Sequence, residues 1–349
     1  MELHSLLSGA SRGFGPSLLR GALSLAAPCY GLMMRLRNQA YDAGWFATHR
    51  TDVPVVSIGN ITTGGTGKTP LVAWTVQMLL EQGLLPGILS RGYRDVDGAG
   101  NDEKRLLDAI CPEVPHIQQP DRVAGAMAAI AKHHCEVLVL DDGFQHRRLA
   151  RDLDIVLIDA VRPFGYEAVL PRGLLREPLS ALGRADAAII TRVDHCGASR
   201  LAEIRQIIRQ HTDASIAEVR FVPTGLVNSS GIARPLLELH SARVGACCAI
   251  GNPEGFLRTL TAAGLPPPVG CFRTFPDHHH YSTADLDDIA RWVEHERIEQ
   301  LLVTRKDLVK IPHDQLGPAG LWAIDLTTEF VAGEQPLRDQ LRATAKGTR

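Results

Sequence analysis

The sequence predicts an α/β protein: a mainly parallel sheet with helices on both faces, followed by a smaller C-terminal α/β domain. From residue 53 to about 215, short apolar runs alternate with helical patterns, as expected of successive βαβ units. A second and shorter alternation begins near residue 243. In addition, a glycine-rich turn follows the first apolar run, and this layout is typical of a P-loop NTPase-like fold.

The spacing of apolar residues and the length of each segment predict where the strands and helices of the first alternation lie. Short apolar runs bounded by turn residues predict strands, and apolar residues at three- and four-residue spacing predict helices. The expected strands are 53–58, 86–90, 136–140, 154–159 and 186–191, and the expected helices are 68–82, 103–110, 121–134, 178–183 and 198–211.

After residue 215 the periodicity changes. The runs 219–222 and 225–227, followed by a turn at 228–231, predict a hairpin that joins two domains. Ser282 and Asp285 match a capping box at the start of a later helix. The second alternation predicts strands at 243–250, 269–275, 299–304 and 321–326, with helices at 253–263 and 283–295.

These patterns divide the chain into five parts. They are an N-terminal helical segment at a membrane interface (1–45), a core domain (46–215), a two-stranded linker (216–242), a C-terminal α/β domain (243–330) and a polar tail (331–349). We expect the tail to be frayed, because it is polar and terminal.

Composition excludes several classes of protein. The chain has 349 residues, 45% of them hydrophobic and 22% charged, which is ordinary for a globular protein. A net charge of −2 without an aromatic-basic repeat argues against a nucleic-acid partner. The seven cysteines form no C-x-x-C pair, which favours free thiols in a reducing, cytoplasmic compartment. Nothing in the sequence calls for an obligate protein partner.

The N-terminal segment is unlike the rest of the chain. Residues 21–34 carry no charge, and Arg20, Arg35 and Arg37 flank them. This run is interrupted by Pro28 and is shorter than the 20 or so residues needed to span a bilayer. Apolar residues framed by arginines are typical of a helix that lies in the interface of an anionic membrane. The alternative is a helix packed on the protein's own core.

The run from Gly59 to Pro70 has the layout of a phosphate-binding loop. Glycines at 64, 65 and 67 let backbone N–H groups curl around an anion, and a helix begins at the same point. We expect Gly64, Gly65, Thr66, Gly67, Lys68 and Thr69 to bind the phosphates of ATP. Lys68 would reach the β- and γ-phosphates and the Thr69 hydroxyl would ligate Mg²⁺. The loop has Thr62 where the usual pattern has glycine, and the alternative is a glycine-rich turn without a ligand.

Two further strand ends carry charged residues. Asp141 and Asp142 follow the apolar run 137–140, which is how such folds deliver carboxylates to Mg²⁺. Because the two are adjacent they point differently, and which of them contacts the metal stays open; a helix cap or turn is the alternative. Arg91, after the run 86–90, could bind phosphate, or it could form a surface ion pair. His146 could orient a carboxylate or simply pack.

Two loops complete the set of candidates. The proline- and glycine-rich segment 170–178 carries Arg172, Arg176 and Glu177 beside apolar residues, which suits an anionic and partly apolar substrate. The run 275–281 holds three consecutive histidines. They cannot share one face, so a zinc site is not expected, but one of them could assist proton transfer near neutral pH.

Six motifs together resemble the tetraacyldisaccharide 4′-kinases of lipid A synthesis. They occur in that family's order: 59–70, Ser90-Arg91-Gly92-Tyr93, 141–146, Leu175-Arg176-Glu177-Pro178, Ile250-Gly251-Asn252-Pro253 and Phe275-Pro276-Asp277-His278-His279. Threonine at the position of Thr62 is itself typical of this family. Arg305 departs from its usual pattern but leaves Lys306-Asp307 intact.

The resemblance implies a function and a set of site residues. It implies a monotopic enzyme on the cytoplasmic face of the bacterial inner membrane. With Mg²⁺, this enzyme would transfer the γ-phosphate of ATP to the 4′-hydroxyl of an acylated glucosamine disaccharide 1-phosphate. The nucleotide would bind in a cleft between the two domains. The resemblance assigns the base to Asp102, supported by His278, although Asn101 and Lys104 depart from the family's flanking residues. The expected substrate contacts, Arg172, Arg176 and Glu177, come from the make-up of the 170–178 segment, and which residues hold the 1-phosphate stays open.

Two rival functions stay open at this point. A membrane-associated P-loop ATPase switch would carry an additional lysine at the position that Thr63 occupies here, so its absence argues against that class. A nucleotide-sensing protein without catalysis is the second rival. Phosphate transfer that requires an acylated disaccharide would separate the kinase from both.

Overall fold

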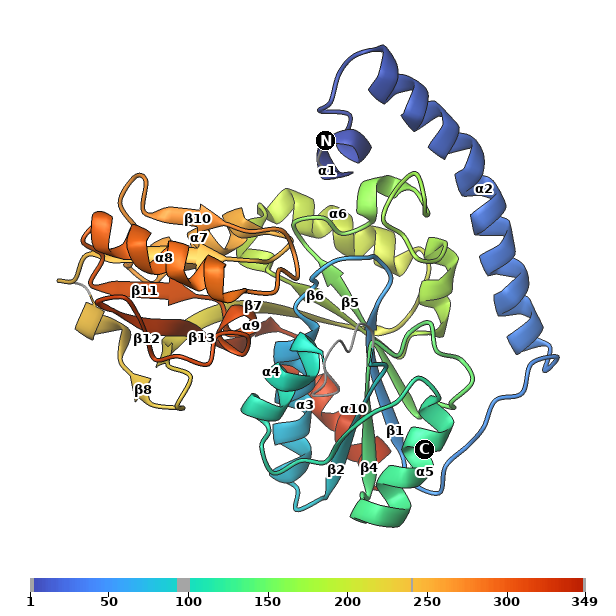
Figure 1. The fold of residues 1–349 in the computed structure, drawn as a ribbon. Helices are drawn as coiled ribbons and strands as arrows, with labels where there is room; N and C mark the ends of the chain where they lie inside the picture. The colour runs from blue at the N-terminus through green and yellow to red at the C-terminus, as the bar shows by residue number, and fades with distance from the viewer. Residues whose placement is uncertain (1–2, 93–100, 240, 348–349) are drawn as a thin grey trace. The chain divides into compact units, whose positions relative to one another are not determined.

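The computed structural model describes residues 3–92, 101–239 and 241–347 and divides the chain into two compact units. Unit 1 comprises Met1–Tyr93, Glu113–Arg220 and Phe330–Arg349, and unit 2 comprises Arg94–Pro112 and Phe221–Glu329. Figure 1 shows the ribbon of both units and labels most of their helices and strands. Tyr93 of the expected 90–93 motif lies outside the described residues.

Unit 1 contains the parallel sheet that the sequence predicts. The strand order is β7-β6-β5-β1-β4-β2-β3, and every pair along it is parallel. The strands are β1 Val55–Asn60, β2 Pro86–Ser90, β3 His116–Gln118, β4 Val137–Asp141, β5 Leu153–Asp159, β6 Ala187–Thr191 and β7 Ser215–Val227. The helices are α1 Leu3–Ser8, α2 Phe14–Asp42, α3 Lys68–Leu80, α5 Arg122–His133, α6 Ala198–Arg209 and α10 Glu334–Ala345, with short 3₁₀ turns η1 Gly165–Glu167, η2 Leu179–Arg184 and η3 Val193–His195.

Complete burial explains why the central strands have largely apolar sequences. All residues of β1, β2, β4 and β6 are buried, as expected where helices cover both faces of a parallel sheet. Leu138 and Leu140 of β4 pack with Ala126 and Ala129 of α5 in one core cluster. Because this core fixes the strands, it also fixes the loops at their carboxyl ends.

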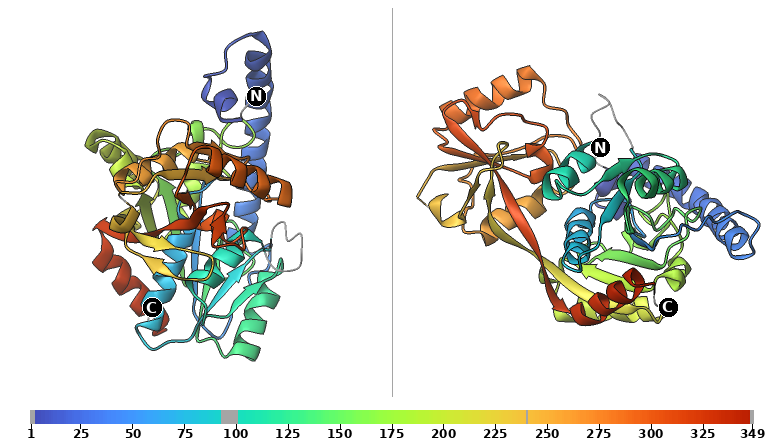
Figure 2. Two further views of the ribbon diagram at one scale, coloured as in Figure 1. Left: turned by 60° about the vertical axis from the view of Figure 1, so that its left-hand side comes forward. Right: turned by 90° about the horizontal axis from the view of Figure 1, so that it is seen from below.

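The N-terminal helix α2 is a single element of 29 residues that continues through Pro28. The sequence predicts an interruption at this proline, and that prediction is wrong. A proline removes only one donor, and here the helix runs along the outside of unit 1, where solvent can hydrate the freed carbonyl (Figures 1 and 2). Among the described residues, no helix combines the length and apolarity needed to cross a bilayer.

Unit 2 contains a smaller parallel sheet with the strand order β10-β9-β11-β13. Ser282 and Asp285 form the predicted capping box at the start of α8, which is confirmed. The strands are β8 Ala233–Arg234, β9 Val244–Cys248, β10 Phe272–Thr274, β11 Gln300–Val303, β12 Gln315–Leu316 and β13 Ala319–Ala332. The helices are α4 Asp102–Ile110, α7 Pro253–Ala262, α8 Thr283–His295 and α9 Arg305–Leu308, with the 3₁₀ turn η4 Leu236–Leu239.

Four segments differ from the sequence-based expectation. The runs 219–222 and 225–227, expected as two strands, form one continuous strand, β7, whose neighbour is the long strand β13; the expected turn at 228–231 does follow it and leads to β8, which pairs antiparallel with β7. The expected α-helix at 178–183 is the 3₁₀ turn η2. The described part of the tail, up to residue 347, is not frayed: α10 buries Leu337 and Leu341, which anchor it. Helix α4 groups with unit 2, whereas the sequence boundaries place it in the core domain.

Candidate active site

The loop between β1 and α3 has the conformation that a phosphate-binding loop requires. Gly67, which precedes α3, has φ 85° and ψ 28°, a left-handed conformation that favours glycine. A Cβ on Gly64 or Gly65 would meet no atom within 4 Å, so the outer side of the loop is open. The Thr66 hydroxyl is buried and has no hydrogen-bond partner among the described residues. The loop therefore offers space and unsatisfied polar groups beside a helix N-terminus.

Lys68 and Asp142 meet next to this loop. Lys68 Nζ lies 3.5 Å from Asp142 Oδ1 and 3.5 Å from Asn60 Oδ1. Arg176 Nη1 donates to both oxygens of Asp142, at 3.0 and 2.8 Å. Burial raises the pKa of Asp142, but Lys68 and Arg176 outweigh it, and the net result is a lowered pKa. Asp142 is thus an ionised carboxylate at neutral pH, held between two cations.

Apolar contacts hold three loops together at this edge. Ile61, Phe144 and Leu175 are buried in one cluster, and each lies next to a loop that carries candidate residues. A Cβ on Gly59 would lie 2.5 Å from Phe144 N, so only glycine allows this close approach of β1 to the segment after β4. Tight packing of these neighbours fixes where Asp142 and Arg176 lie.

A buried arginine, Arg122, was not among the sequence-predicted site residues. It opens α5, is only 3% exposed, and its Nε has no partner among the described residues. Burial lowers its pKa to about 10, and the charges of Asp141 and Asp142 oppose that change. An arginine at this pKa remains a cation at neutral pH. In the sequence Arg122 looks like the first residue of an ordinary helix. Only its burial beside these carboxylates identifies it as part of the site.

His146 and Arg91 lie at the same edge of the sheet. Burial, together with Arg122 and Arg151, lowers the pKa of His146 to about 4, so its ring is neutral at neutral pH. Arg91 is exposed and follows the end of β2. The charge of Arg91 is one of the smaller causes of the lowered pKa of Arg122.

Two of the expected substrate contacts have other partners. Glu177 has no exposed surface and forms a two-point ion pair with Arg184, at 2.6 and 3.0 Å. This is a correction: a carboxylate with no exposed surface supports the loop and does not reach a substrate. Arg172 Nη1 donates to the carbonyl of Leu7 at 2.9 Å, which ties α1 to the 170–178 loop.

Unit 2 builds a second cluster around Asp102. This residue begins α4, after Asn101, whose side chain accepts from the backbone N of Lys104. Asp102 Oδ2 lies 3.4 Å from His278 Nδ1 and 3.1 Å from Lys310 Nζ. The structure therefore brings together two residues that are 176 positions apart in the sequence. Burial raises the pKa of Asp102, but His278 and the lysines outweigh it and lower the pKa to about 2.

Two lysines in this cluster were not predicted as site residues. Lys306 Nζ lies 3.3 Å from His278 Nε2; an ammonium can only donate, so Nε2 accepts and Nδ1–H donates to Asp102. Lys310 is 4% exposed and also lies 3.8 Å from the wholly buried Asp307. The intact Lys306-Asp307 pair in the sequence was the one available signal. Nothing local marked Lys310.

The donors in unit 1 fit a magnesium ion held partly by a nucleotide. They are oxygen donors, among them an ionised Asp142 beside Asp141 and the Thr69 hydroxyl at the start of α3. In the described parts of the chain, no group of three His, Cys, Asp or Glu side chains gathers into a protein-only metal site. Mg²⁺ commonly takes one or two carboxylates and completes its coordination with phosphates and water.

Comparison with known proteins gives one consistent result. A family model described as tetraacyldisaccharide-1-P 4′-kinase matches residues 19–346. Relatives named tetraacyldisaccharide 4′-kinase from Halothermothrix orenii and Anaeromyxobacter dehalogenans strain 2CP-C are 33% and 37% identical; these matches cover 90% and 93% of this chain and 88% and 90% of the relatives. The crystal structure of LpxK from Aquifex aeolicus in complex with ATP matches 93% of this chain and 99% of that one, with a TM-score of 0.76 and 29% identity.

Proposed function

The chain belongs to the tetraacyldisaccharide-1-P 4′-kinase family, and from that premise we propose the reaction it performs. It transfers the γ-phosphate of ATP to the 4′-hydroxyl of a tetraacylated glucosamine disaccharide 1-phosphate, with Mg²⁺, at the cytoplasmic face of the inner membrane. The observation that carries the proposal is Asp102: a buried, ionised carboxylate that His278 and Lys310 hold in place.

The unit 1 loop binds the phosphoryl donor in this proposal. Backbone N–H groups from Gly64 to Thr69 surround the β- and γ-phosphates, and Lys68 neutralises charge on the transferring group. Thr69 and the carboxylates at 141 and 142 would hold Mg²⁺, which supplies charge neutralisation for the phosphates when bound. Lys68 and Arg176 both form ion pairs with Asp142 in the structure, so both cations lie next to the expected metal ligand.

Asp102 acts as the base in this proposal. A sugar hydroxyl has a very high pKa, so its proton leaves late, when bonding to phosphorus has begun. A carboxylate with a pKa of about 2 is ionised at every physiological pH and can accept that proton once the hydroxyl becomes acidic. His278 donates to Asp102 and holds its orientation, and Lys310 keeps it charged.

Arg122 supports the carboxylates at the proposed metal site. It is a buried cation beside Asp141 and Asp142, and one of its N–H groups has no partner among the described residues. Arg172 and Arg176, the substrate contacts expected from sequence, donate to the carbonyl of Leu7 and to Asp142 in the structure.

The exposed face of α2 supports membrane binding. Seven large apolar side chains on this helix are between 42% and 85% exposed: Phe14, Leu18, Leu19, Leu25, Leu32, Met33 and Leu36. A contiguous apolar face on a helix flanked by arginines partitions into the interface of anionic lipid. Such placement would let the enzyme reach a substrate whose acyl chains stay in the bilayer.

A radiolabelled transfer assay tests the proposal. The protein is incubated with [γ-³²P]ATP, Mg²⁺ and mixed micelles that contain the acylated disaccharide 1-phosphate, and label in the lipid is measured. We expect transfer that requires the acylated acceptor and is lost in Lys68→Ala. If ATP is hydrolysed at the same rate with and without the acylated acceptor, and no labelled lipid forms, the result would instead indicate the membrane-associated ATPase switch.

A further inference from the structure

The helix α2 presents two different faces. Its apolar outer residues, including Leu18, Leu25 and Leu32, repeat at seven-residue spacing and are exposed. Tyr30, Arg37 and Asn38 also follow helical spacing, but these side chains are half-buried against unit 1. One helix thus carries the face suited to lipid and a polar face directed at the protein.

The polar face reaches both loops that surround Asp142. The Tyr30 hydroxyl donates to the carbonyl of Arg176 at 2.8 Å. Asn38 Nδ2 donates to Glu177 Oε2 at 2.6 Å. Arg37 Nη2 donates to the carbonyl of Gln145 at 2.8 Å. These bonds join residues more than 100 positions apart, so they form only in the folded unit.

The residues contacted adjoin the groups that hold Asp142. Arg176 donates through its side chain to Asp142 and, at 3.2 Å, to Gln145 Oε1. Gln145 Nε2 in turn donates to the carbonyl of Asn60, at the end of β1. Tyr30 thus contacts the backbone of Arg176 itself, and Asn38 contacts the next residue, Glu177. If these contacts shifted, the Arg176 guanidinium would shift with them.

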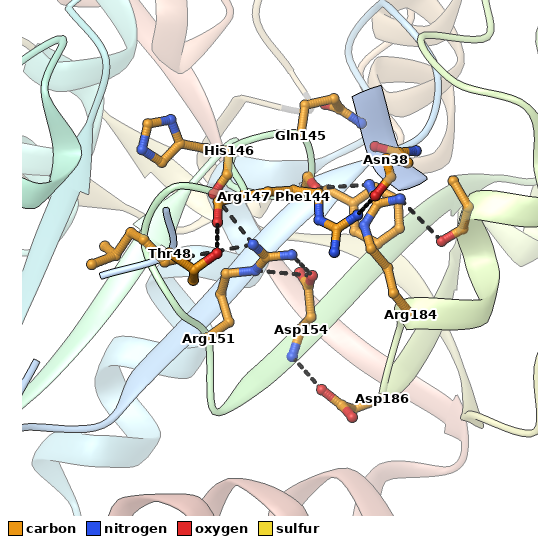
Figure 3. Close-up of polar contacts among 12 residues, drawn as sticks. Asn38, Thr48, Phe144, Gln145, His146, Arg147, Arg151, Asp154, Arg184 and Asp186 are labelled. Carbon is orange, nitrogen blue, oxygen red and sulfur yellow. Dashed lines mark hydrogen bonds and ion pairs between the residues drawn. The ribbon is translucent and has the colours of Figure 1, made fainter. Parts of the chain in front are cut away.

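The buried ion pair of Glu177 and Arg184 holds the segment that Asn38 contacts. Glu177 is fully buried and must be paired, because a buried carboxylate without a partner destabilises the fold. Arg184 supplies two of its hydrogen bonds, donates to the carbonyl of Phe144 at 2.8 Å, and lies 3.9 Å above the Phe144 ring. Figure 3 shows Asn38, Phe144, Gln145, Arg147 and Arg184 within one network of polar contacts.

We propose that Tyr30 and Asn38 of α2 are positioning residues for the phosphoryl-transfer site. They hold the Arg176–Glu177 segment so that the Arg176 guanidinium meets Asp142. The helix expected to contact the bilayer is then also part of the framework of the catalytic loops. This inference rests on the proposed phosphoryl transfer, and it adds residues that touch neither nucleotide nor acceptor.

The test measures the labelled-lipid transfer rate of Asn38→Ala and Tyr30→Phe in the full-length protein. Loss of an outer partner of a catalytic group lowers activity by roughly 10–100-fold. We expect kcat to fall by that order, while binding to vesicles of phosphatidylcholine and phosphatidylglycerol is unchanged, because both residues face the protein. Gln39→Ala is the matched control: it alters an exposed polar residue of the same helix and should keep the wild-type kcat.

A double-mutant cycle with Arg176→Ala separates positioning from general damage to the fold. If Asn38 acts through Arg176, then adding Asn38→Ala to Arg176→Ala causes no further loss of kcat. Multiplicative losses, or a wild-type kcat in Asn38→Ala, would overturn the inference. If Asn38→Ala does not fold, Tyr30→Phe, which removes only a hydroxyl, decides in the same cycle. Absence of transfer by the wild-type protein would instead count against the proposed function.

Discussion

Replacing Asp102 with asparagine tests the unit 2 cluster most directly. Asparagine keeps the size of the side chain and leaves the N-cap of α4, Asn101, unchanged, but it cannot ionise. The change of the Asp102 pKa from an ordinary 3.8 to about 2 corresponds to about 2 kcal/mol in favour of the charged, folded state. Because the folded-state pKa is depressed, this contribution is fully present above the ordinary pKa and is lost as the pH falls through about 2.

The variant lacks this contribution at every pH. Its free energy of unfolding, measured by urea denaturation, should therefore lie about 2 kcal/mol below that of the wild type at pH 7, and the difference should begin to close as the pH falls below about 4. In the transfer assay its kcat should fall by about 10²–10⁴-fold while ATP still binds. Asp108→Asn is the control, since Asp108 lies on the same helix in an ion pair with Lys104 and is 40% exposed. Equal stability at pH 7 would refute the charge argument, and an intact kcat would refute the role of base.

Three further predictions concern unit 1. Lys68→Ala should weaken ATP binding in calorimetry and lower kcat by about 10²–10³-fold, because it removes a cation from the phosphates; unchanged values of both would contradict the phosphate-binding loop. Glu177→Gln should lower the free energy of unfolding by about 3 kcal/mol, because Arg184 loses its buried counter-charge, and a wild-type urea transition would argue against that ion pair. Leu25→Glu combined with Leu32→Glu should weaken co-sedimentation with anionic vesicles by at least about 10²-fold, and equal sedimentation would exclude α2 as the lipid-binding face.

Local sequence predicted the parts of the protein that are built from neighbouring residues. The strand, glycine turn and helix around Lys68 were recognisable because a phosphate-binding loop is made by consecutive backbone groups. The same holds for the capping box at Ser282 and for β2, whose bounds Pro86–Ser90 agree with the expected 86–90. In each case the physical cause acts within a few residues.

Segments whose state depends on distant contacts were predicted less well. Helix α10 has a polar sequence, but the burial of Leu337 and Leu341 stabilises it. Helix α2 continues through Pro28, and η2 takes the 3₁₀ form where the sequence suggested an α-helix. Propensity is a weak determinant compared with tertiary packing, so these differences are of the expected kind.

The sequence by itself determined that the chain carries a phosphate-binding loop, a carboxylate at the end of β4 and the family motifs, because each of these is a local pattern. Only the tertiary structure decided which charges meet. It placed Lys310 and His278 on Asp102, turned Glu177 inward to Arg184, and brought Tyr30 and Asn38 to the loop of Arg176. A carboxylate's pKa and orientation depend on the charges and donors that surround it in space, and in this protein those groups come from segments far apart in the chain.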